Sequence, residues 1–228
     1  MPDAASWFSP ALAALGVVNI LYGALCAMAQ QDLKKLVAYS SISHMGYVCL
    51  GMAAFTPMAL NGAVMQMFSH GVITAMLFLL VGVVYDRAHH RDINGFGGLA
   101  SVTPVYAGMV ALAFFASLGL PGLSGFIAEA LVFLGSYQNP AMQACVVLAT
   151  GGIVVGAAFH LWAYQRMFMG RLNPKYQALE EINGRELFTL VPLAVICVVV
   201  GCFPSIVLNL IASGMASLHA GVIPYWAP

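Results

Sequence analysis

One carboxylic acid lies alone inside an apolar stretch that is long enough to cross a membrane. Glu129 lies within Val105–Gln138, which contains no other Asp, Glu, Lys, Arg or His. An ionisable side chain at the centre of a bilayer costs about 2.5–3.5 kcal/mol on insertion scales and marks a functional site by default. Because a carboxyl group can hold and release a proton, we predict proton transfer at Glu129. A structural Glu that stays protonated or paired is the alternative.

Two histidines lie at similar depth in neighbouring apolar stretches, each on a polar stripe. Residues three and four apart share one face of a helix. The two stripes with this spacing are Ser40, His44 and Tyr47, and Gln66, His70 and Thr74, with Ser69 beside the second. Histidine titrates near neutrality and can pass a proton through either ring nitrogen. A lone histidine would more often be a core residue, but the combination favours a hydrated proton path through His44, His70 and Glu129.

Other reactive residues form no recognisable site. His160 lies near one end of its apolar stretch, close to Arg166, and we expect a structural role for it. The five cysteines have no spacing typical of a CxxC pair, a zinc site or an iron–sulfur cluster. No phosphate-binding glycine loop or nucleophile motif occurs. We therefore expect no cofactor and no metal ion in this chain.

The composition places these residues in a membrane protein. Of the 228 residues, 61% are hydrophobic and only 7% are charged, against about 25% charged residues in a typical soluble domain. These charges are too few to cover a water-exposed surface, which excludes a soluble globular protein and a disordered chain. Eight basic and eight acidic residues leave no net charge, so nucleic acid is not an expected partner.

Six stretches are long enough to cross a bilayer, because one helical crossing needs about 20 residues. They are Ala11–Ala29, Leu36–Phe55, Met58–Tyr85, Val105–Gln138, Ala141–Gln165 and Leu187–Ala212. The fourth is too long for one straight helix and is interrupted by GLPGLSG at 119–125, where proline and glycine favour an unwound segment. We predict an all-α polytopic membrane protein with six transmembrane helices, the fourth of them broken.

The predicted break would put Glu129 near the N-terminus of a half-helix. The dipole of that helix favours the carboxylate anion, whereas the loss of surrounding water favours the neutral acid. Irregular backbone at mid-membrane is tolerated only where it lines a cavity or is buried in protein. A carboxyl group under these opposing influences is suited to proton transfer.

All eight Lys and Arg residues fall in or beside alternate connections between the predicted helices. They are Lys34 and Lys35, then Arg87 and Arg91, then Arg166, Arg171, Lys175 and Arg185. By the positive-inside rule these connections face the cytoplasm and both termini face outward. The alternation also supports six helices, because one missed helix would divide the basic residues between the two sides.

Four segments resemble the antiporter-like membrane subunits of respiratory complex I. They are QDLKKLVAYSSISHMG at 31–46, QMFSHG at 66–71, YDRAHHRD at 85–92 with GGL at 97–99, and LGLPGLSGF at 118–126 with Glu129. Related chains occur in multisubunit cation/proton antiporters and membrane-bound hydrogenases. Within this set the sequence most closely resembles chain M, called chain 4 in mitochondria, because the sister chains L and N usually carry Lys where Glu129 stands.

The resemblance implies the C-terminal part of a chain M that contains two inverted five-helix repeats. Residues 1–168 would form one five-helix antiporter-like repeat, and residues 169–228 a cytoplasmic loop and a final transmembrane helix. His44, His70 and Glu129 match positions assigned to the proton path in that family. A fragment, a split gene product and an incomplete gene all remain open.

The resemblance also implies a function. We expect a proton-translocating membrane subunit of NADH–quinone oxidoreductase, which couples quinone reduction in other subunits to proton transfer. Its expected partners are the other membrane subunits of complex I, especially chains L and N, and the lipid of a bacterial inner membrane rather than a mitochondrial one. The alternatives are a subunit of a cation/proton antiporter or a membrane-bound hydrogenase, and a structural fragment that conducts nothing.

Overall fold

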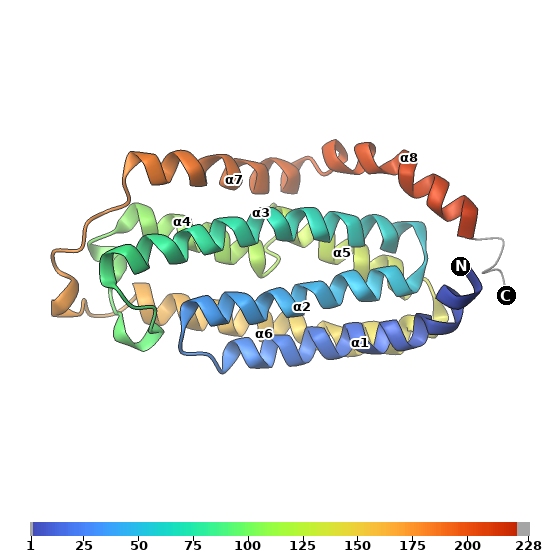
Figure 1. Cartoon of the computed structure of the whole chain (residues 1–228), viewed down its shortest axis with the longest axis horizontal. Helices are drawn as coiled ribbons and strands as arrows, with labels where there is room; N and C mark the ends of the chain where they lie inside the picture. Colours follow the sequence, from blue (N-terminus) through green and yellow to red (C-terminus); the bar gives the residue numbers. More distant parts are fainter. Residues whose placement is uncertain (1, 223–228) are drawn as a thin grey trace.

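The computed structural model describes residues 2–222 and shows a bundle of helices that run along one long axis (Figure 1). The α-helices are α1 (Pro2–Met28), α2 (Leu33–Ala54), α3 (Pro57–Ala88), α4 (Pro104–Ser117), α5 (Ser124–Tyr137), α6 (Gln143–Phe168), α7 (Gly184–Cys202) and α8 (Ser205–Val222). Within residues 2–222 there is no β-strand, and one isolated bridge joins Asp32 to Asp92. The predicted all-α fold is confirmed.

Four of the described helices are individually long and apolar enough to cross a membrane: α1, α3, α6 and α7. α2 has a similar length but carries the polar stripe that contains His44. α4 and α5 are shorter apolar helices, and they match one crossing only when taken together. The six predicted crossings therefore correspond to α1, α2, α3, the α4–α5 pair, α6 and α7.

The predicted break separates α4 from α5. α4 ends at Ser117, and α5 begins at Ser124 after an irregular segment. Within that segment Gly119 has φ = +78° and Gly122 has φ = +94°, values that residues with a Cβ rarely adopt. Pro121 lies between them and lacks the backbone N–H that a continuous helix would need. The interruption of this crossing is therefore a property of its own sequence.

The prediction of one continuous helix from Leu187 to Ala212 is wrong. α7 ends at Cys202, and Phe203 leaves the helical conformation with φ = −126° and ψ = 64°. The physical reason is Pro204, which has no backbone N–H and whose ring clashes with the preceding turn of a helix. α7 alone meets the length and hydropathy of a crossing, and α8 follows it after this second interruption.

The three connections that carry basic residues meet at one end of the bundle (Figure 1). The backbone N–H of Leu33 donates a hydrogen bond of 2.9 Å to the carbonyl of Arg91, and that of Gly98 donates one of 3.0 Å to the carbonyl of Met169. The start of α1 and the end of α8 lie at the opposite end. Met1 and residues 223–228, the last of the predicted part 169–228, lie outside the described residues.

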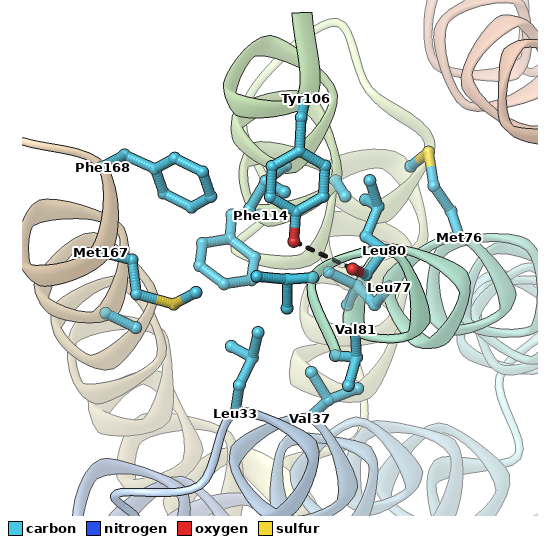
Figure 2. Packing of buried hydrophobic residues seen from close by; sticks show 14 of the residues in the cluster. Leu33, Val37, Met76, Leu77, Leu80, Val81, Tyr106, Phe114, Met167 and Phe168 are labelled. Atoms are coloured by element: carbon cyan, nitrogen blue, oxygen red, sulfur yellow. Dashed lines mark hydrogen bonds between the residues drawn. The ribbon is translucent and has the colours of Figure 1, made fainter. Parts of the chain in front are cut away.

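An apolar cluster fills the interior of the bundle from the basic connections as far as the polar stripes. Figure 2 shows part of this cluster; the labelled side chains come from α2, α3, α4 and α6 and include Leu33, Val37, Leu80, Phe114, Met167 and Phe168. Tyr106 is buried among them, and its hydroxyl donates a hydrogen bond of 2.9 Å to the carbonyl of Leu80. This bond satisfies the one polar atom of a buried side chain and fixes α4 against α3.

Candidate proton-transfer site

His44 and Glu129 lie next to each other in the interior of the bundle. Nδ1 of His44, on α2, is 3.6 Å from Oε1 of Glu129, on α5. Their side chains are only 12% and 10% exposed. The separation is slightly longer than a hydrogen bond, so that a small ring rotation or one water molecule would connect the two groups. The arrangement allows a proton to move between a carboxyl group and an imidazole.

The break and the start of α5 together position the carboxyl group of Glu129. Glu129 lies in the second turn of α5, close to the N-terminal end of that helix, where the positive end of the helix dipole lies. A Cβ atom added to Gly119 would lie 2.8 Å from Oε2 of Glu129. The backbone of the break therefore lies directly against the acid, and any side chain at position 119 would displace it.

Both ring nitrogens of His44 have further polar neighbours. Nε2 is 3.1 Å from the hydroxyl oxygen of Ser117, at the end of α4, and Nδ1 is 3.3 Å from the amide nitrogen of Gln66, on α3. Because an amide nitrogen only donates, Nδ1 accepts in this arrangement and Nε2–H donates to Ser117. The buried carbonyl oxygen of Gln66 has no hydrogen-bond partner. If the amide group turned around, this oxygen would accept a hydrogen bond from a protonated Nδ1–H of His44. The site can therefore hold His44 in either charge state.

His70 extends the site along α3. Its ring centroid is 5.4 Å from that of His44, and the hydroxyl oxygen of Thr74 is 3.1 Å from its Nδ1. A cavity of about 10 Å³ is lined by His70, His44 and Glu129 among others, which is close to the smallest space that holds one water molecule. The structure thus brings together the three residues for which the sequence predicts a proton path, and their role remains a prediction.

A second cavity of about 10 Å³ connects the same acid to α6. Its lining includes His44, Ser117, Glu129 and His160. From the sequence, His160 is expected to have a structural role away from this site. Its place in the cavity could not be predicted, because α6 is remote from α2 and α5 along the chain. Ser117 was also not predicted from the sequence, although its position two residues before the glycine–proline interruption is a signal that could have identified it.

The sequence predicts no metal ion for this site. In the part of the chain that the structure describes, no group of three or more His, Cys, Asp or Glu side chains could hold one. The polar groups that surround the two cavities are carboxyl, imidazole, hydroxyl and amide groups, which donate and accept protons.

Residues 1–156 match the family model described as "NADH:quinone oxidoreductase/Mrp antiporter, TM". Subunit M of NADH-quinone oxidoreductase from Rhodobacter capsulatus is 42% identical over 205 residues, which are 90% of this chain and 40% of the relative. F(420)H(2) dehydrogenase subunit M from Methanosarcina mazei is 44% identical over 214 residues, 92% of this chain and 43% of that protein. The chain thus spans less than half the length of these curated relatives.

Solved structures show the same fold. A chain of respiratory complex I from Thermus thermophilus with bound NADH superposes with a TM-score of 0.86 and 32% identity, and the match covers 96% of this chain and 46% of the other. A chain of the Mrp complex from Dietzia sp. gives a TM-score of 0.82 over 94% of this chain and 48% of its own length. At 20% identity the second likeness concerns the fold alone.

Proposed function

Because this chain belongs to the NADH:quinone oxidoreductase/Mrp antiporter transmembrane family, we propose that it is a proton-translocating membrane subunit of an NADH–quinone oxidoreductase of the complex I type. Quinone reduction takes place in other subunits, and its free energy drives protons through this one. The 42% identity to a subunit M and the likeness to a chain of complex I support this assignment.

The contact between His44 and Glu129 is the observation that carries the proposal. A buried carboxyl group 3.6 Å from an imidazole can exchange a proton with it without crossing bulk water. His70 supplies a further imidazole within 5.4 Å of His44, measured between ring centroids. A change of charge in a neighbouring subunit would alter the free energy of the carboxylate relative to the neutral acid, and the proton would then move along His44, His70 and Glu129.

The partners and orientation follow from the same proposal. The other membrane subunits of the complex, with chains L and N foremost, contact this chain in a bacterial inner membrane. The basic connections face the cytoplasm and both termini face outward. One relative is named an F(420)H(2) dehydrogenase subunit and another an NADH-quinone oxidoreductase subunit, which supports a role common to both. Residues 1–168 act as one repeat, and residues 169–228 supply the loop and final helix.

Replacement of Glu129 in the assembled complex tests the function. Glu129→Gln keeps the shape of the side chain but cannot carry the proton, and we expect proton pumping in liposomes to fall roughly tenfold or more while the complex still assembles. Glu129→Asp should retain part of the activity. The matched control is Glu180→Gln, the same chemical change at an exposed loop position, which should pump normally.

Two results would contradict the proposal. Normal pumping in the Glu129→Gln complex would favour the structural alternative, in which the chain holds its neighbours but conducts nothing. Ion transport that requires Na⁺ or K⁺ on one side of the membrane would favour the cation/proton antiporter.

A further inference from the structure

His160, on α6, has one satisfied ring nitrogen and one that has no partner. Nδ1 lies 2.9 Å from the carbonyl oxygen of Gly156, one helical turn earlier. Because a carbonyl only accepts, Nδ1 carries the hydrogen, and Nε2 of the neutral ring is left with a free lone pair. That Nε2 is buried and makes no hydrogen bond, and the whole residue is 1% exposed. Buried polar atoms nearly always have a hydrogen-bond partner, so the absence of one at this Nε2 requires an explanation.

The surroundings of His160 hold the imidazole beside the acid. The rings of Phe114 and Phe159 pack on it, with centroids 5.1 and 4.2 Å away. The polar residues that share its cavity include Glu129, His44 and Ser117 of the candidate site, with Ser43 and Tyr47 beside them. Apolar packing on the ring and a small polar cavity beside it would confine any proton accepted by Nε2 to this site.

The depth of His160 differs from that of His44. His160 lies eight residues before the end of α6, and His44 lies eleven residues after the start of α2. Both of those helix ends are at the basic end of the bundle. At 1.5 Å per residue the two histidines are about 12 and 16 Å from their helix ends, so His160 is the nearer to the basic connections.

Building on the function proposed above, we propose that His160 is a fourth proton-carrying group of this site and accepts the proton of Glu129 through one water molecule in the cavity that both residues line. The O–H bond of the neutral Glu129 acid breaks, its proton passes to one water molecule in the shared cavity, and a proton of that water forms the Nε2–H bond of His160. The products are the Glu129 carboxylate and the His160 imidazolium, and no electron is transferred. The reverse transfer restores the neutral pair.

The test compares two substitutions of His160 in the assembled complex. His160→Gln can still bond to the Gly156 carbonyl but cannot carry the extra proton, and His160→Phe preserves packing among aromatic rings. We expect each to assemble and to lower proton-coupled turnover roughly tenfold to a hundredfold. The control is Phe168→Leu, which disturbs aromatic packing on α6 against Tyr106 and Tyr164 rather than on His160 and should keep proton-coupled turnover near normal.

A double substitution tests whether Glu129 and His160 act in one proton path or only support the same packing. If Glu129 and His160 act in sequence, Glu129→Gln with His160→Gln should pump no more slowly than Glu129→Gln alone, whereas independent effects would multiply. Normal pumping in both His160 variants, with Glu129→Gln impaired, would overturn this inference and leave the proposed function intact. An equal loss in Phe168→Leu, or a multiplied loss in the double variant, would assign His160 to packing. Normal pumping in Glu129→Gln would overturn the proposed function itself.

Discussion

Gly201, in the last turn of α7, lies directly against the backbone of Gly122 in the break between α4 and α5. A Cβ atom on Gly201 would be 2.4 Å from the carbonyl oxygen of Gly122 and 2.5 Å from Cα of Leu123. The thiol of Cys202 also donates to the Gly122 carbonyl, at 3.6 Å. The interruption in α4–α5 and the one at Pro204 therefore meet, and α7 supports the segment that holds Glu129 in place.

We predict that Gly201→Ala will destabilise the chain by about 1–3 kcal/mol, because its Cβ atom meets backbone atoms that cannot move cheaply. Displacement of the break should also lower proton pumping. The measurement is thermal unfolding of the assembled complex, with Gly108→Ala as control, since a Cβ atom there meets nothing within 4 Å. Equal stability of the two variants would show that α7 does not support the break.

Ser117→Ala removes the hydroxyl group that accepts from Nε2–H of His44. A buried donor left without a partner costs about 1–3 kcal/mol, so the ring should turn and the contact with Glu129 should weaken. We expect a several-fold loss of coupled turnover with normal assembly. The matched control is Ser136→Ala, which changes a buried serine on α5. An equal loss of turnover in this control would mean that the effect of Ser117→Ala does not arise from its contact with His44.

Arg87 joins the end of α3 to the start of α7. Its two terminal nitrogens donate to the two carboxylate oxygens of Glu186 at 3.0 and 2.8 Å, and it also donates to the carbonyls of Glu180 and Glu181. Lys cannot reproduce this planar, bidentate arrangement. We predict that Arg87→Lys will weaken the attachment of the loop 169–183 by about 1–3 kcal/mol.

Limited proteolysis of the complex measures the attachment of that loop. Cleavage within 169–183 should become faster in Arg87→Lys, and Arg185→Lys should behave as the wild type, because Arg185 is exposed and lies outside the ion pair. Unchanged cleavage in Arg87→Lys would mean that other contacts hold the loop.

The proposed orientation predicts which loops a membrane-impermeant thiol reagent can reach. Ala141 and Lys175 are both exposed and lie in opposite connections. A Cys at position 141 should be labelled from the outer side, and a Cys at position 175 only from the cytoplasm. The wild type reports background from native cysteines, and reversed labelling would invert the orientation.

Several features of this protein are readable from short segments of sequence. The cost of burying a charge singles out Glu129, the spacing of three and four residues puts His44 and His70 on polar faces, and the run at 119–125 predicts the break. The structure confirms the break and buries Glu129, because both depend on residues close together in the sequence, and the role of the three residues stays a prediction. The interruption at Pro204 is equally local, but the apolar residues on both sides of it favour the prediction of one continuous crossing.

Which helices pack against one another could not be predicted from short segments in the same way. Segments far apart in the chain must pack together before Ser117 and His160 can line the site, or before Arg87 can pair with Glu186. That packing depends on close backbone approaches such as Gly46 against Gly16 and Gly201 against Gly122. Helical periodicity tells which residues share a face, but the steric fit of the whole bundle selects the faces that meet, since a single methyl group at such a contact would separate them.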